Sequence, residues 1–155
     1  MAPEGPFLRL EAKGSQADCQ GPVKLRQAFD IALKYASERV QFGTAIINFQ
    51  MIQDMLADMA TELQAARLLS YWAATLADQG NRVRLEASYA KLFCSQVGMR
   101  VVDKATQILG GYGFISEFPI ERMYRDMKGI EFGAGTTQIQ KLIIARELIK
   151  GMGGA

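Results

Sequence analysis

The sequence contains no histidine among its 155 residues. Catalysis by a Ser-His-Asp triad or a Cys-His pair needs an imidazole, and so does a zinc site of the HExxH type. Cysteine is almost as scarce, because Cys19 and Cys94 are the only two and form no CxxC arrangement. These absences exclude most hydrolase machinery and argue against a metal site. We interpret Cys94 as a small buried hydrophobe, the usual state of a free cysteine.

Long apolar runs are also lacking. No segment approaches the roughly 20 apolar residues that span a bilayer, and the opening MAPEGPFLRLEAKG has no apolar signal-peptide core. We therefore expect a soluble, intracellular chain with no membrane insertion. The net charge is only +2, and its basic residues form no stripe of the kind that nucleic-acid binding requires. Nucleic acid is not an expected partner.

What the chain does contain is ordinary globular composition, with 49% hydrophobic and 22% charged residues. That is enough for one domain with a core. Residues 1–22 are rich in Gly and Pro without sustained periodicity, so we expect an irregular N-terminal segment there. Residues 23–151 form the predicted domain, and residues 152–155 are a tail.

Apolar residues recur at spacings of three and four over most of the domain, which predicts amphipathic helices. The expected helices are 23–40, 50–77, 83–109, a short one over 120–127, and a last one that begins at Thr136 or Thr137. Thr137 with Gln140 fits a capping box. No strand pattern of any length competes, and residues 41–49 are read as a connection. The predicted fold is all-α, an antiparallel four-helix bundle.

The core of this bundle is predicted from the apolar stripes. Met59 and Leu63 lie on the stripe of the second helix, and Val97 and Val101 lie on that of the third. The stripe of the first helix consists of Leu25, Ala28, Phe29, Ala32, Leu33 and Ala36.

Three polar constellations could bind ligands. Arg39 is a fixed cation beside a glycine turn, which suits a diphosphate, although an arginine near a helix C-terminus also interacts favourably with the macrodipole. Gln107 precedes Gly110 and Gly111, where glycines let another molecule approach, although they also serve as a helix cap. In residues 133–138, GAGTTQ, helix N-terminal donors could face a polar ligand or be used only for capping.

The chain from about Gln27 to Gly151 resembles the C-terminal helical domain of acyl-CoA dehydrogenases. The first matching motif is the Arg-x-Gln-Phe-Gly turn at 39–43, and a Phe-Gln pair then opens the next helix. The runs LADMA at 56–60 and QILGGYGFISEFPIERMYRDMK at 107–128 follow in order. The last match is the family's C-terminal signature, carried here by Arg125, Asp126, Lys128, Gly135, Thr136, Gln138, Ile139 and Gln140.

The resemblance implies an FAD cofactor and an acyl-CoA substrate. It also implies self-association into dimers or tetramers, and other dehydrogenase subunits are candidate partners. It implies contacts with the flavin of a neighbouring subunit for Arg39, Gln41, Phe42, Gln50, Gln107, Gly110 and Gly111. Within the same subunit, Thr136 and Gln138 would contact the flavin, whereas Ala134 and Gly135 would lie along the acyl thioester. The implied compartment is a bacterial or archaeal cytoplasm or the mitochondrial matrix.

The family reaction needs a carboxylate, which removes a proton from the α-carbon of the thioester while the flavin accepts hydride from the β-carbon. In most of the family, a Tyr and the catalytic Glu occupy the positions of Gly133 and Ala134. The sequence is similar in this respect to the isovaleryl-CoA and long-chain dehydrogenases, whose Glu lies ahead of the first helix of the domain. That place falls near Lys13 here, so no catalytic residue is assigned.

The family's N-terminal helical and β domains are not found in this sequence. We therefore expect the C-terminal domain of an FAD-dependent acyl-CoA dehydrogenase that is inactive as this chain alone. The alternative is a non-catalytic helical subunit or module that pairs with other dehydrogenase subunits. A third reading is a plain helical bundle without a ligand.

Overall fold

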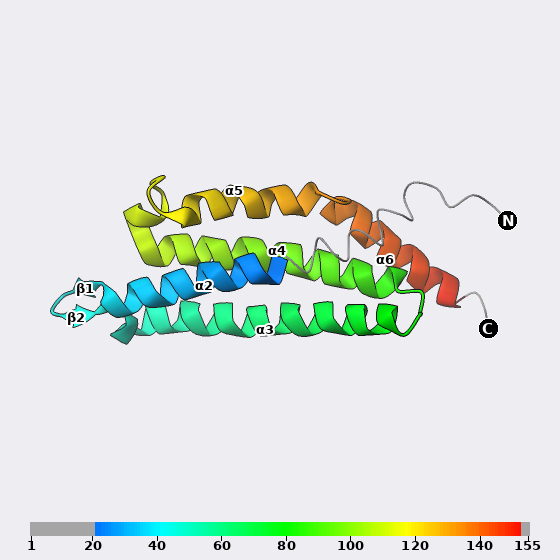
Figure 1. The fold of residues 1–155 in the computed structure, drawn as a ribbon, viewed down its shortest axis with the longest axis horizontal. Helices are drawn as coiled ribbons and strands as arrows, with labels where there is room; N and C mark the ends of the chain where they lie inside the picture. Colours follow the sequence, from blue (N-terminus) through cyan, green and yellow to red (C-terminus); the bar gives the residue numbers. More distant parts are fainter. Residues whose placement is uncertain (1–20, 153–155) are drawn as a thin grey trace.

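A computed structural model describes residues 21–152, with side chains from Leu25 onward (Figure 1). The elements in chain order are α2 (Gly21–Glu38), β1 (Val40–Gln41), β2 (Thr44–Ala45), η1 (Ile46–Asn48), α3 (Gln50–Asp78), α4 (Arg84–Leu109), η2 (Gly110–Gly113), α5 (Pro119–Phe132) and α6 (Thr137–Met152). The prediction of an all-α fold is confirmed.

Helix α4 lies at the centre of the bundle. Helices α2 and α3 pack against it on one side and α5 on the other, while α6 lies across the far end of α4 (Figure 1). Helices α3 and α4 are antiparallel and joined by a short loop, as the predicted bundle requires. No helix within residues 21–152 is long and apolar enough to cross a membrane.

Most of the predicted stripe residues are buried. Met59, Val97 and Val101 are 0% exposed, and so are Leu25 and the three alanines of the α2 stripe. The stripe of α2 was predicted too wide, because Leu33 is exposed and Phe29 is only partly buried. Its small alanines let α2 lie close to its neighbours, and the fully covered face of residues 25–38 is a narrow stripe of Leu25 and these alanines.

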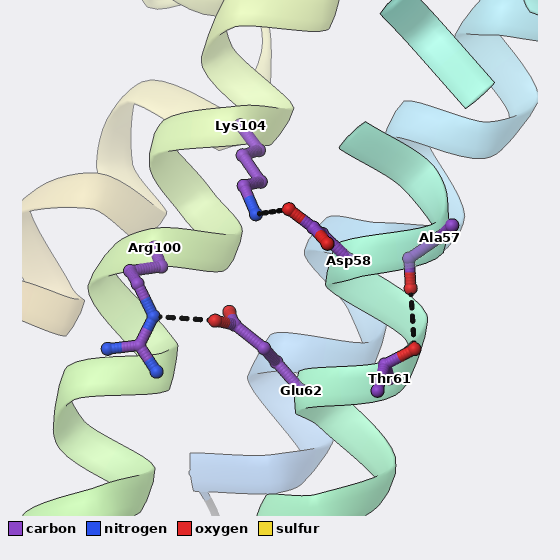
Figure 2. Close-up of polar contacts among 6 residues, drawn as sticks. All are labelled: Ala57, Asp58, Thr61, Glu62, Arg100 and Lys104. Atoms are coloured by element: carbon purple, nitrogen blue, oxygen red, sulfur yellow. Dashed lines mark hydrogen bonds and ion pairs between the residues drawn. The ribbon is translucent and has the colours of Figure 1, made fainter. Parts of the chain in front are cut away.

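Two ion pairs join α3 to α4 along one edge of the bundle (Figure 2). Glu62 Oε1 lies 2.7 Å from Arg100 Nε, and Asp58 Oδ2 lies 2.7 Å from Lys104 Nζ. Asp58 and Glu62 are four residues apart on α3, as are Arg100 and Lys104 on α4, so each pair of residues lies on one face of its helix. Both ion pairs can therefore form when the two helices run antiparallel. Since all four side chains are partly exposed, we expect each pair to contribute at most about 1 kcal/mol.

The segment 41–49, predicted as a plain connection, contains a small hairpin. Strands β1 and β2 pair antiparallel, with Val40 opposite Ala45 and Gln41 opposite Thr44. Phe42 and Gly43 form the turn with φ of 52° and 80°. Positive φ at both central residues is typical of the type I′ turns that close two-residue hairpins. Strands of two residues are too short for an alternating pattern to reveal.

Helix boundaries also differ from the prediction in α5 and α2. Helix α5 begins at Pro119 and continues to Phe132, beyond the predicted end at Met127, because Gly129 lies within the helix instead of ending it. Helix α2 begins at Gly21, so residues 21–22 of the expected irregular segment are helical, and it ends at Glu38 instead of residue 40, because Val40 belongs to β1. Residues 1–20, and 153–155 of the expected tail, lie outside the described part of the chain.

Candidate functional site

Arg39 lies between α2 and the hairpin, and its main chain is held on both sides. Its N–H donates to the carbonyl of Tyr35 at 2.8 Å, and its carbonyl accepts from the N–H of Ile46 at 2.8 Å. The guanidinium, in contrast, is exposed and has no ion-pair partner among the residues that the structure describes. The arrangement therefore presents an unneutralised cation on a fixed backbone, which suits an anionic ligand.

Phe42 at the tip of the hairpin is 94% exposed. It also adopts a φ of 52°, a conformation that costs a non-glycine residue about 1–2 kcal/mol. Its ring is arranged edge-on to that of Phe49, with centroids 6.3 Å apart. An exposed aromatic ring on a strained backbone is unusual unless something else covers it, and strain of this kind concentrates at ligand sites.

The second constellation is the end of α4. Gly110 has φ 58° and ψ −132°, a conformation that is essentially restricted to glycine, so the sharp exit from the helix requires this residue. A Cβ on Gly111 would meet nothing within 4 Å, so its backbone is open to an approaching molecule. The side chain of Gln107 is exposed on the last turn of α4.

Tyr112 connects these two constellations. Its ring centroid lies 6.0 Å from that of Tyr35, near the end of α2, and 5.3 Å from that of Phe118, just before α5. The hairpin, the start of α3 at Gln50 and the loop after α4 thus share one end of the bundle (Figure 1). Seven residues assigned by resemblance are therefore gathered there: Arg39, Gln41, Phe42, Gln50, Gln107, Gly110 and Gly111.

The third constellation lies at the other end of α5. Because α5 has 14 residues, it separates the two regions by about 21 Å along its axis. The turn at 133–135 has Ala134 at φ 52° and Gly135 at φ 102°. Ala134 is exposed and Gly135 is half-buried. The two groups of residues therefore cannot belong to one small contact area.

The last carbonyls of α5 are capped, which fixes the start of this turn. The N–H of Gly133 donates to the carbonyl of Gly129 at 3.0 Å, and the buried ammonium of Lys91 donates to that of Ile130. The hydroxyl of Thr137 donates to the carbonyl of Glu131 at 3.3 Å. Capping of this kind satisfies groups that a helix terminus otherwise leaves unpaired.

Thr136 is the N-cap of α6, because its Oγ1 accepts a hydrogen bond from the N–H of Ile139 at 3.3 Å. The predicted capping box of Thr137 with Gln140 is wrong, since the Thr137 hydroxyl turns back to α5 instead. The N–H groups of residues 134–137 find no acceptor within the described part of the chain. Together with the exposed side chain of Gln138, they leave hydrogen-bonding capacity for a ligand.

Residues 18–149 match the family model described as acyl-CoA dehydrogenase, C-terminal domain. The chain belongs to this family. It is 48% identical over 123 residues to a cyclohexane-1-carbonyl-CoA dehydrogenase of Geobacter metallireducens, a match that covers 79% of this chain and 32% of that protein. It is 44% identical over 131 residues to a mitochondrial isovaleryl-CoA dehydrogenase of Oryza sativa subsp. japonica, covering 84% of this chain and 32% of the relative.

The fold is likewise shared with solved structures of the family. Butyryl-CoA dehydrogenase from Megasphaera elsdenii superposes with a TM-score of 0.89 and 35% identity, over 92% of this chain and 37% of that one. The chain thus spans about a third of the length of the relatives it matches. Members of the family are FAD-dependent flavoproteins.

Two residues near the turn were not singled out as site residues from the sequence. Lys91 lies on α4, far away in the chain, and its role depends on the packing of α5 against α4. Gln140 was noted only as part of the C-terminal signature, yet it is buried beside Gly135. No group of three or more His, Cys, Asp or Glu side chains that could hold a metal ion occurs within residues 25–152.

Proposed function

We propose that this chain is the C-terminal helical domain of an FAD-dependent enzyme that carries out α,β-dehydrogenation of an acyl-CoA thioester. The observation that carries the proposal is the pairing of two polar regions at opposite ends of α5, each on a fixed backbone with open hydrogen-bonding capacity. The domain would contribute flavin contacts and part of an oligomer interface. Relatives from a bacterium and from mitochondria fit a cytoplasmic or matrix location.

The residues of the hairpin end fit a flavin nucleotide bound by a neighbouring subunit. The unneutralised guanidinium of Arg39 would bind the diphosphate, and Phe42 would cover an aromatic part of the nucleotide. The carboxamides of Gln41, Gln50 and Gln107 are all exposed and could donate to its oxygens. Gly110 and Gly111 would let the nucleotide lie against the main chain.

The turn before α6 would serve the flavin and substrate of the same subunit. Thr136 and Gln138 would hydrogen-bond the nucleotide, and the acyl thioester would lie along Ala134 and Gly135. Bound FAD would supply the redox chemistry by accepting hydride. The turn itself holds no acidic side chain, since residues 133–135 are Gly, Ala and Gly. The base must therefore come from outside residues 133–135.

The chain alone is expected to show no acyl-CoA dehydrogenase turnover. The turn offers no general base, whose contribution is about 10²–10⁴-fold, and the chain supplies only part of each flavin site. The measurement is reduction of an artificial electron acceptor by a series of acyl-CoA esters with added FAD. A chain-dependent rate with any of these esters would contradict the prediction, and a full-length relative serves as the positive control.

The alternative is a non-catalytic module that pairs with other dehydrogenase subunits. The observation in its favour is that Arg39, Gln107 and Gly111 face outward, as they would in order to complete a partner's site. Co-purification from the native host separates the two proposals. A larger polypeptide carrying this sequence supports the dehydrogenase, whereas the 155-residue chain in complex with a separate flavoprotein subunit supports the module.

The chain is expected to self-associate. The outer face of α3 exposes Leu68, Tyr71 and Trp72, and α6 exposes Leu142, Leu148 and Ile149. Soluble monomers rarely leave large apolar patches uncovered. Light scattering at tens of micromolar should give a dimer or tetramer, and Trp72→Arg should shift the distribution toward the monomer. Leu33→Arg, at an exposed position of α2, is the matched control, and a wild-type chain that is a clean monomer contradicts the prediction.

A further inference from the structure

Two carbonyls near the end of α5 accept hydrogen bonds from side chains instead of from the main chain. In a continuing α-helix, the carbonyl of residue i accepts from the N–H of residue i+4. Here the carbonyl of Ile130 accepts from the buried ammonium of Lys91 on α4. The carbonyl of Glu131 accepts from the hydroxyl of Thr137, at the start of α6, at 3.3 Å. Side chains from two other helices thus replace the main-chain donors that a continuing helix would supply.

The main-chain N–H groups that are displaced in this way belong to Ala134 and Gly135. Neither of them donates a hydrogen bond to any group within the described part of the chain. Ala134 is exposed on the turn, and Gly135 is half-buried. The turn can offer both main-chain donors to a ligand, because side chains hold the two carbonyls to which these donors would otherwise bind.

This open form of the turn is not the conformation that Ala134 prefers by itself. Alanine is the best helix former and would readily extend α5. Ala134 instead has a φ of 52°, in the left-handed region that its Cβ disfavours. Burying a cation is also costly, yet the buried ammonium of Lys91 occupies a carbonyl that the neutral N–H of Ala134 could satisfy. Capping of α5 alone would not require this arrangement, whereas keeping the turn open does.

We propose that Lys91 and Thr137 are positioning residues of the 133–135 turn. By holding the two carbonyls of α5, they stop the helix from extending and keep the N–H groups of Ala134 and Gly135 available to a ligand. The consequence for binding rests on the proposed function, which places an acyl-CoA thioester and a flavin nucleotide at this turn. Neither Lys91 nor Thr137 needs to touch the ligand, because each acts through the main chain of the turn.

The test is amide hydrogen exchange and backbone ¹³C chemical shifts of the ¹⁵N,¹³C-labelled full chain. Lys91→Met keeps most of the length of the side chain and removes the ammonium. We expect the N–H of Ala134 then to bind the carbonyl of Ile130, and the ¹³C shifts of Ala134 to move toward helical values. Exchange of this amide should become about 3- to 10-fold slower, the range for one hydrogen bond.

Two further variants keep the test decisive. Thr137→Val removes the hydroxyl at a half-buried position outside the core and should slow exchange at Gly135, so it decides alone if Lys91→Met does not fold. Lys104→Met is the matched control, because it removes an ammonium of the same helix that pairs with Asp58 instead, and it should leave the turn unchanged. Wild-type exchange and ¹³C shifts at the turn in a folded Lys91→Met or in Thr137→Val would show that the replaced side chain only stabilises packing, and would overturn the inference for it.

Titration with FAD and with butyryl-CoA, each alone at millimolar concentrations, separates failure of the inference from failure of the proposed function. A ligand that shifts the amides of residues 134–138 in the wild type should bind Lys91→Met about 3- to 10-fold more weakly, because it loses a main-chain donor. Equal affinity in a variant whose turn has closed would overturn the role in binding. If neither ligand shifts residues 134–138, the proposed function of the turn fails, whereas the exchange data still decide whether Lys91 and Thr137 hold it open.

Discussion

Met59→Ala is expected to lower the free energy of unfolding by about 2–5 kcal/mol, the range for truncating a buried Met side chain. Met59 is 0% exposed and belongs to the core formed by α2, α3 and α4. The truncation leaves a cavity that these helices cannot fill without losing other contacts. The measurement is urea unfolding followed by circular dichroism, at one fixed protein concentration because an oligomer's stability depends on it.

The same helix offers a matched control for this substitution. Met51 is 79% exposed near the start of α3, so Met51→Ala removes the same atoms without opening a cavity. Its effect should stay within about 0.5 kcal/mol, as for most surface substitutions. Equal effects for the two variants would mean that Met59 is not enclosed, and that the packing of α2 against α3 and α4 differs from the one described.

The long helices could be predicted from the sequence because their apolar stripes extend over many turns. Helix α3 ends at Asp78 and α4 begins at Arg84, each within one residue of the prediction. Over 29 and 26 residues, the apolar stripes repeat many times and outweigh any single exception. Gly80 and Gly110 both adopt positive φ, which is the reason that glycines mark these ends so clearly.

The end of α5 and the N-cap of α6 could not be predicted from the sequence, because both depend on tertiary contacts. Helix α5 runs past Gly129 to Phe132, where Lys91 from α4 and Thr137 from beyond the turn cap its final carbonyls. Neither contact is visible without the packing. The sequence does not decide between Thr136 and Thr137 as the N-cap for the same reason. Thr136 takes this role because the hydroxyl of Thr137 donates to the carbonyl of Glu131 on α5.

The candidate site, too, could be predicted only in part from the sequence. Residue types at Arg39 and Gln107 suggested ligand contacts but allowed simple capping as well, and only the resemblance to the family favoured a flavin. The structure adds that Arg39 has no ion pair within its described part and that Tyr112 ties the two regions together. The burial of Gln140 beside Gly135 could not be predicted from the sequence, because it depends on the path of the 133–135 turn.

Ala134→Glu should restore turnover in a full-length dehydrogenase that carries this domain and whose own catalytic carboxylate has been replaced. Ala134 is exposed on the turn, and its backbone already has a φ of 52°, so glutamate adds little strain beyond that of alanine. A carboxylate within hydrogen-bond reach of the α-carbon's proton can act as the base, which is worth about 10²–10⁴-fold. The measurement is acyl-CoA-dependent reduction of an electron acceptor.

Recovery by Ala134→Glu should be partial, because Gly133 lacks the tyrosine found beside the base in most of the family. Gly133 has φ −66° and ψ 145°, which any residue can adopt, and a Cβ there would lie 3.3 Å from the carbonyl oxygen of Gly129, so the turn has to shift slightly to accept a side chain. With that shift, Gly133→Tyr in the same protein should raise the recovered rate. Ala134→Gln is the matched control, since it has the same shape but no basic oxygen, and it should recover nothing. If Ala134→Glu gives no more turnover than this control while both bind FAD and acyl-CoA, residues 133–135 do not face the α-carbon, and the proposed position of the thioester is wrong.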